Sequence, residues 1–197
     1  MLPGARTITP SKDLTTLPPT DQDTPGGRGS KSGRRTRGLP HKVWHDPGCI
    51  AALGFGAGAA PYAPGTAGTL VAIPLYVLIA PLPRLWYAAV VIALFATGIW
   101  LCGRAQRVLG GHDHPAIVWD EIVGYLLAMF MAPPGWIWVA VGFALFRLFD
   151  IWKPFPIRII DRTMHDGLGI MLDDVLAGIY AWAGVQILAL FFLEWPA

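Results

Sequence analysis

Two acidic doublets stand beside the most apolar segments of this chain. Asp120-Glu121 comes directly before the stretch Ile122 to Ala132, and Asp173-Asp174 comes directly before Val175 to Leu193. Placing a carboxylate at the edge of the hydrocarbon region costs free energy, so such residues usually pair with another group and serve a function. The fold must therefore bring each doublet to another charged group or to a bound ion.

The composition is that of a membrane protein. The 197 residues are 54% hydrophobic and 14% charged, with a mean hydropathy of +0.48. In ordinary soluble domains about a quarter of the residues are charged. The length supports one domain, and the composition places that domain in a bilayer.

The apolar residues gather in separate stretches that predict helices. A full membrane crossing needs about 20 apolar residues, and most of these stretches are shorter. We therefore predict an all-α fold, a polytopic membrane helical bundle of four to five short membrane helices plus interfacial helices. The stretches are Thr66 to Leu82, Trp86 to Cys102, Ile122 to Ala132, Trp136 to Phe149, and Val175 to Leu193.

The first 43 residues differ from the rest of the chain. They hold eight Lys or Arg and three Asp, whereas residues 44–197 hold seven basic and ten acidic side chains. Segment 1–43 has no apolar periodicity and is rich in Pro, Gly, Ser and Thr, which predicts a disordered basic tail. Its Arg cluster would also suit a nucleic acid. The favoured interpretation is a cytoplasmic tail near anionic lipid, with no nucleic-acid partner. Residues 44–197 then form the membrane-embedded domain.

The basic residues predict the orientation, because Lys and Arg beside membrane segments stay on the cytoplasmic side. If the tail is inside, only Arg84 of the later basic residues lies outside. Both acidic doublets then lie on the cytoplasmic face. The basic residues expected inside are Arg104, Arg107, Arg147, Lys153, Arg158 and Arg162.

Small residues at helical spacing follow each doublet. Such stripes let membrane helices approach closely, so the two helices are expected to pack and bring the four carboxylates to one ion. Clustered oxygen ligands suit a hard cation such as Mg²⁺. The alternative is that the acids only cap helix N-termini. The stripes are Gly124, Ala128 and Ala132, and Gly178, Ala181 and Gly184; the predicted ligands are Asp120, Glu121, Asp173 and Asp174.

Two further segments carry candidate functional side chains. His112, Asp113 and His114 precede the first doublet, and general acid or base work is one interpretation because histidine titrates near neutral pH. Zinc binding is a weaker option, and a polar loop closed by Pro115 is the structural alternative. Asp150 is another candidate proton carrier.

Basic side chains near Asp150 suit a doubly charged phosphate. Arg147 lies three residues before Asp150 on one helical face, and Lys153 and Arg158 follow. Arginine binds phosphate through a forked pair of donors and lysine binds it as a point charge. The alternative is that these residues only anchor the chain at the inner membrane surface. The segments Pro64 to Thr66 and Asp166 to Gly169 are weaker candidates for backbone contacts to phosphate.

Absent residues narrow the chemistry. No serine follows Ser32, so the membrane domain offers no seryl nucleophile. Neither cysteine precedes an arginine at the spacing of a cysteine phosphatase loop. Metal-activated water and attack by a carboxylate remain.

Four motifs in order resemble the phosphatidylglycerophosphatase A family. They are Pro64 to Thr66, His112 to Glu121, Phe146 to Arg158, and Gly169 to Gly178, within about residues 50 to 180. One departure is His165-Asp166-Gly167, where the family resemblance leads us to expect His-Gly-Gly.

The resemblance implies a multi-pass enzyme of the bacterial inner membrane with its active site on the cytoplasmic side. It would be a magnesium-dependent phosphoric monoester hydrolase that converts phosphatidylglycerophosphate to phosphatidylglycerol and phosphate. The oligomeric state is left open. Two rival functions are a divalent-cation transporter or channel, because acids in membranes also line ion pathways, and a scaffold whose doublets only cap and pair helices. A phosphatase for another lipid phosphomonoester is a third alternative.

Overall fold

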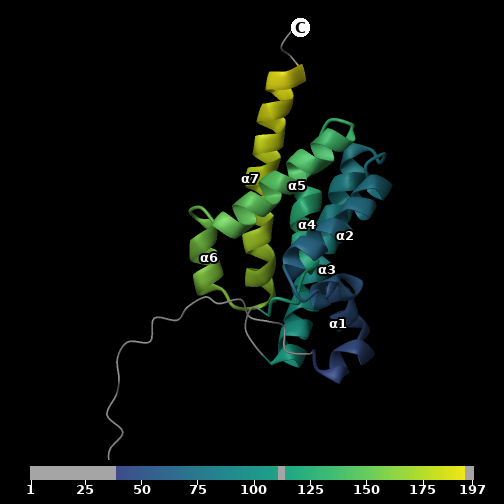
Figure 1. The fold of residues 1–197 in the computed structure, drawn as a ribbon, viewed down its shortest axis with the longest axis vertical. Helices are drawn as coiled ribbons and strands as arrows, with labels where there is room; N and C mark the ends of the chain where they lie inside the picture. Colours follow the sequence, from purple (N-terminus) through teal and green to yellow (C-terminus); the bar gives the residue numbers. More distant parts are fainter. Residues whose placement is uncertain (1–38, 111–113, 194–197) are drawn as a thin grey trace, which may run out of the picture. The chain divides into compact units, whose positions relative to one another are not determined.

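The fold, given by a computed structural model, is described for residues 39–110 and 114–193. This part of the chain is all-helical and contains no strand (Figure 1). In chain order its helices are the 3₁₀ helix η1 (His41–His45), α1 (Pro47–Ala52), the 3₁₀ helix η2 (Gly54–Ala59), α2 (Pro64–Ile79), α3 (Arg84–Leu109), α4 (Trp119–Ala128), α5 (Trp136–Trp152), α6 (Ile157–Thr163) and α7 (Gly167–Leu193).

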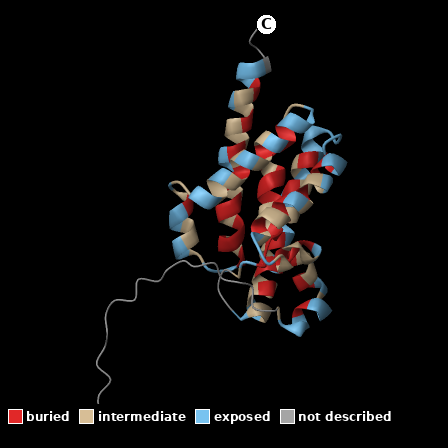
Figure 2. Cartoon of the chain, viewed as in Figure 1, coloured by how far each residue is buried: buried red, intermediate tan, exposed pale blue. Residues whose placement is uncertain are grey.

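Helix α4 lies at the centre of the packing. It contacts α2, α3, α5 and α7, and seven of its ten residues are buried. Figure 2 shows buried residues lining the inner sides of these helices, with exposed residues facing outward. Because α4 is enclosed by other helices, any charged side chain in its first turn must find its partners within the protein.

Within the described part of the chain, two helices, α3 and α7, are long and apolar enough to cross a membrane. In each, 28% of the most apolar window is buried inside the protein, so most of that apolar surface faces outward. Helix α2 is a shorter apolar helix, and α4 has 10 residues, about 15 Å at 1.5 Å per residue. The all-α prediction is thus confirmed, and two of the expected four to five membrane helices are long enough by themselves.

The predicted packing of α4 against α7 is confirmed, and glycine makes it possible. A Cβ atom on Gly178 would lie 2.5 Å from the carbonyl oxygen of Gly124, and a Cβ on Gly124 would lie 2.7 Å from the carbonyl oxygen of Asp174. Real Cβ atoms do not approach other atoms so closely. The two backbones therefore touch beside the second acidic doublet.

Helix α7 begins earlier than the apolar pattern predicts. We expected it to start with Val175, but it starts at Gly167, so Asp173 and Asp174 lie inside the helix. Asp166 ends the preceding loop, and its Oδ1 accepts a hydrogen bond from the backbone N–H of Gly169 at 2.8 Å. The cap of α7 is thus Asp166, and the doublet does not serve as its cap.

Asp46, the residue before α1, accepts hydrogen bonds from the N–H groups of Gly48 and Cys49 and from Arg104 of α3. The Arg104 guanidinium holds the pKa of Asp46 below its usual range. These bonds attach α1 to α3.

The predicted tail, 1–43, falls mostly on residues outside the described ranges, and its disorder stays a prediction. The predicted domain boundary at residue 44 falls within η1.

We expect Gly178→Ala to destabilise the protein by about 1–3 kcal/mol, because the added methyl group would force α4 and α7 apart. The measurement is thermal unfolding of the purified protein in detergent. Gly103→Ala in α3 is the matched control, since its Cβ would meet nothing nearer than 3.7 Å. Equal melting temperatures for the two variants would contradict a tight α4–α7 crossing.

Candidate active site

Three carboxylates converge where α4 crosses α7. One oxygen each from Asp120, Glu121 and Asp174 lies within 4.8 Å of the others. Asp120 and Glu121 come from the first turn of α4, and Asp174 comes from the second turn of α7. Among the described residues, Asp120 Oδ1, Glu121 Oε2 and Asp174 Oδ2 are buried without a hydrogen-bond partner. Buried polar atoms normally have hydrogen-bond partners, so these unpaired oxygens indicate a site that binds an ion or a ligand.

The spacing of these oxygens fits a divalent cation. Ligands on opposite sides of an octahedral Mg²⁺ lie about 4.2 Å apart, and those of Ca²⁺ about 4.6–5.2 Å apart. The observed limit of 4.8 Å falls in this range. Carboxylates this close repel one another and cannot all stay ionised in a buried site without a cation. The cluster therefore can hold a hard metal ion, whose identity the spacing does not select.

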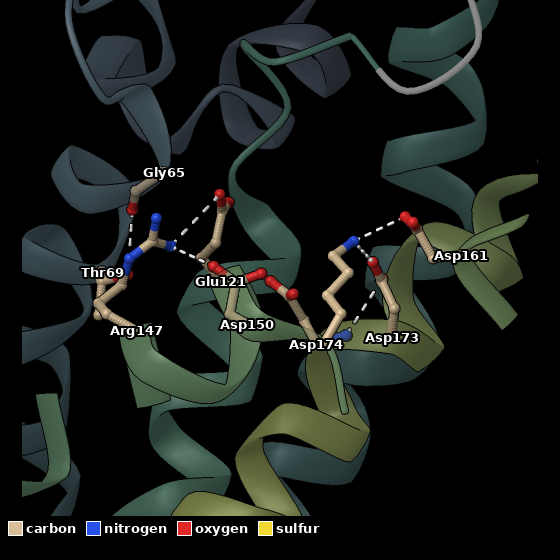
Figure 3. A network of polar contacts seen from close by, with 9 residues as sticks. Gly65, Thr69, Glu121, Arg147, Asp150, Asp161, Asp173 and Asp174 are labelled. Carbon is tan, nitrogen blue, oxygen red and sulfur yellow. Dashed lines mark hydrogen bonds and ion pairs between the residues drawn. The ribbon is translucent and has the colours of Figure 1, made fainter. Parts of the chain in front are cut away.

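Asp173 faces away from this cluster. Its Oδ2 accepts a hydrogen bond from Lys153 Nζ at 2.6 Å, and Lys153 Nζ also donates to Asp161 Oδ1 at 2.6 Å (Figure 3). Burial alone would lower the pKa of Lys153, but Asp173 and Asp161 outweigh it and raise the pKa above its usual range. The amine is therefore a cation at neutral pH. Both predictions for this pair, Asp173 as a metal ligand and Lys153 as a phosphate ligand, stay untested.

Arg147 of α5 supplies positive charge beside the cluster. Its Nη1 lies 2.6 Å from Asp150 Oδ2 and 3.9 Å from Glu121 Oε1. In Figure 3 the carboxylate of Asp150 points toward Asp174, so Asp150 lies between the arginine and the cluster. Four acids here face one arginine, which leaves an excess of negative charge that a metal ion would neutralise.

Helix α2 reaches the same place through Gly65. A Cβ atom on Gly65 would collide with Glu121 Oε1 and would lie 3.0 Å from Arg147 Nη1. The first turn of α2 thus lies against the acid–arginine pair. The carbonyl oxygen of Gly65 accepts a hydrogen bond from the hydroxyl of Thr69 at 3.0 Å, within the same helix.

The remaining predicted residues are His112, Asp113, His114 and Arg158. His112 and Asp113 lie outside the described residues. His114 Nδ1 accepts a hydrogen bond from the N–H of Ala116 at 3.2 Å, and burial lowers the pKa of His114. The ring is therefore neutral near pH 7, with its proton on Nε2. Arg158 is exposed, and its Nη2 lies 3.4 Å from the carbonyl oxygen of Trp152.

Sequence reasoning missed two contributors to this site. Gly65 belongs to a segment that the sequence singled out as a weak phosphate candidate and as a family motif, and no local signal shows that it abuts Glu121. Asp161 was not singled out as a site residue, whereas it accepts a hydrogen bond from Lys153.

Taken together, the fold and the site define a helical protein with outward-facing apolar helices and a buried carboxylate centre suited to a divalent cation. A family profile described as Phosphatidylglycerophosphatase A matches residues 50–189. The chain therefore belongs to the phosphatidylglycerophosphatase A family, and it is a phosphatase, a phosphoric monoester hydrolase.

Individual relatives agree with this assignment. The chain is 44% identical over 156 residues to phosphatidylglycerophosphatase A of Escherichia coli, a match that covers 78% of this chain and 86% of the relative. It is 46% identical over 134 residues to that of Haemophilus influenzae, with coverage of 67% and 82%. A Bacteroides thetaiotaomicron protein, provisionally described as a phosphatidylinositol-3-phosphatase, is 42% identical over 146 residues, with coverage of 70% and 91%. No solved structure matches the chain.

We expect Gly65→Ala to lower kcat at least tenfold, because the methyl group would displace Glu121 and Arg147 from each other. The measurement is steady-state phosphatase activity together with a melting curve. Gly103→Ala again serves as the control and should keep wild-type activity. Full activity in Gly65→Ala would show that α2 can retreat without disturbing the site.

Proposed function

We propose that this protein hydrolyses phosphatidylglycerophosphate to phosphatidylglycerol and phosphate, with Mg²⁺ as cofactor. The observation that carries the proposal is the buried cluster of Asp120, Glu121 and Asp174 beside Arg147. The names of the relatives in Escherichia coli and Haemophilus influenzae support the choice of substrate. The choice of magnesium rests on the oxygen-only ligands and on the resemblance to the phosphatidylglycerophosphatase A family, whereas the spacing alone fits any hard divalent cation.

The cluster residues would hold the metal ion, which when bound supplies a Lewis acid for the phosphoryl oxygens and lowers the pKa of a bound water. Arg147 would orient the phosphate, since its Nε is buried and has no hydrogen-bond partner among the described residues. Burial of the site limits entry of bulk water. The proton carriers proposed from the sequence are His112, Asp113, His114 and Asp150, and Arg158 would attract the anionic headgroup from the exposed surface.

A multi-pass location in the bacterial inner membrane fits the exposed side chains. Leu78, Leu85 and Ile137 are 74%, 80% and 68% exposed, which would be unfavourable in water and favourable in lipid. Arg104 and Arg107 lie at the end of α3 that packs against α1, whereas Arg84 lies at the other end. This bias supports an orientation in which the carboxylate cluster would face the cytoplasm. Helices α2 and α5 would complete the membrane bundle, with four to five membrane helices in all.

A groove on α5 supports an amphiphilic substrate. Arg147 shares this groove, of about 850 Å³, with Ala144, Leu148, Ile151 and Trp152. Leu148, Ile151 and Trp152 are each more than half exposed. A lipid phosphate that reaches Arg147 along α5 would keep its glycerol and first acyl carbons against these apolar groups while its headgroup enters the cluster.

The first test is phosphate release from phosphatidylglycerophosphate in mixed micelles, with Mg²⁺ and with EDTA. We expect EDTA to abolish the activity and Asp120→Asn or Asp174→Asn to lower kcat at least 100-fold, because each removes a negative ligand. Asp166→Asn is the matched control, since asparagine also caps a helix. Phosphate release that survives EDTA, or full activity in both cluster variants, would refute the proposal.

The second test concerns the groove. We expect Ile151→Ser to lower kcat/KM for long-chain phosphatidylglycerophosphate about tenfold, equivalent to about 1.4 kcal/mol of lost apolar contact. A short-chain, water-soluble analogue should be hydrolysed as by the wild type. Ile187→Ser is the control, because Ile187 on α7 has a similar exposure, 66% against 72%, outside the groove. An equal loss for both substrates would mean that the acyl chains do not lie on α5.

A divalent-cation transporter is the alternative from another class. Its acids should form a path through the bilayer, whereas here they occupy one end of α4 and α7. Cation flux into liposomes by a protein without phosphatase activity would favour the transporter. The provisional description of the Bacteroides thetaiotaomicron relative motivates phosphatidylinositol 3-phosphate as a second substrate in the same assay.

A further inference from the structure

Lys153 joins three helices at the edge of the carboxylate site. It follows the last residue of α5 in a left-handed conformation, with φ 46° and ψ 64°. From there its amine contacts Asp161 of α6 and Asp173 of α7, each at 2.6 Å. The Lys153 side chain is 25% exposed and that of Asp173 is 12% exposed. This bridge is therefore a partly buried connection among α5, α6 and α7.

The charge at this bridge does not suit a phosphate. Lys153 contributes one positive charge, and Asp161 and Asp173 contribute two negative charges. The net charge of the three side chains is negative when all are ionised, so an approaching phosphate dianion would be repelled. Lys153 is instead matched to carboxylates.

Asp173 links the bridge to the cluster. Consecutive residues of an α-helix point about 100° apart, so the direction in which Asp173 is held also limits the direction of Asp174. Asp173 Oδ2 binds Lys153, and its Oδ1 accepts a hydrogen bond from the N–H of Asp174 at 3.1 Å. With Asp173 held toward Lys153, the next side chain is directed at Glu121 and Asp120.

We propose that Lys153 and Asp161 are positioning residues, which fix the rotation of the start of α7 and so present Asp174 to the other carboxylates. This inference rests on the proposed function, since it takes Asp174 as a ligand of the metal ion. Lys153 and Asp161 touch neither the ion nor the substrate. They act through Asp173, in the way that hydrogen-bonded residues behind a metal ligand commonly do.

Loss of the bridge should leave the fold intact. Ile157 of α6 is completely buried, and the hydroxyl of Tyr180 on α7 donates to the carbonyl oxygen of Phe155 at 3.0 Å. These contacts hold α6 and the α5–α6 link against α7 without Lys153. The variants below therefore test positioning of the site.

The experiment uses the full chain purified in detergent, with Lys153→Met, Lys153→Arg, Asp161→Asn and the Lys153→Met/Asp161→Asn double variant. Metal binding is measured without substrate, from Mn²⁺ binding by electron paramagnetic resonance and from the shift in melting temperature with Mg²⁺. Steady-state kinetics then give kcat, KM for the lipid, and the Mg²⁺ concentration for half-maximal rate. Asp166→Asn is the control at the start of α7.

We expect Lys153→Met to weaken metal binding about tenfold and to lower kcat, while KM for the lipid changes by about twofold or less. Asp161→Asn should shift the same quantities in the same direction by a smaller factor. Lys153→Arg should recover part of the loss, and the double variant should be no worse than Lys153→Met, because both changes break one bridge.

If Lys153 bound the phosphate, the effects on KM and on metal binding would be the reverse. Lys153→Met would then raise KM for the lipid and leave Mn²⁺ binding unchanged, which would overturn the inference. If Asp161→Asn binds metal with the same affinity as the wild type, the inference is also overturned. If either of these contradicting results is found while the wild type binds metal and Asp174→Asn does not, only the positioning inference has failed. If the wild type binds neither Mn²⁺ nor Mg²⁺, the proposed metal site fails as well.

Discussion

The contact between the backbones of α4 and α7 is the constraint on which the site depends. At Gly124 and Gly178 the helices are so close that neither position has room for a Cβ atom. Helices that approach this closely bring the side chains one turn away within reach of each other. Asp120 lies one turn before Gly124, and Asp174 lies one turn before Gly178. The glycine crossing therefore sets the separation of the carboxylates, and larger residues at the crossing would separate them.

The crossing also explains how charge is distributed around the site. Glu121, next to Asp120, faces Arg147 of α5 and the glycine-lined start of α2. Asp173, next to Asp174, faces Lys153. The first doublet thus gives both of its carboxylates to the cluster, and Glu121 also lies beside Arg147. The second doublet gives Asp174 to the cluster and directs Asp173 toward Lys153. The two cations, Arg147 and Lys153, lie on either side of the carboxylate cluster, which retains an excess of negative charge.

The sequence predicts the part of this arrangement that is local. Small residues three or four apart predict that α4 and α7 pack together, and the doublets mark where the charge lies. The start of α7 could not be predicted from hydropathy, because Gly167 to Leu172 carries its apolar side chains against other helices and its cap, Asp166, resembles any loop acid. The partners of Lys153 could not be predicted either, since α5, α6 and α7 meet only in the folded chain. Gly65 is a third example: its need for a bare Cα arises from Glu121, which lies 56 residues later.

The energetic argument for function comes from what the site costs the fold. Apolar side chains of similar volume would pack between α4, α5 and α7 at least as stably as buried, mutually repelling acids with a single arginine. Among the described residues, three buried carboxylate oxygens have no hydrogen-bond partner, which adds to that cost. Capping does not account for Asp174, because it lies well inside α7 and Asp166 already caps that helix. A bound divalent cation would remove both the repulsion and the missing contacts, so the cost of the ion-free site would favour metal binding.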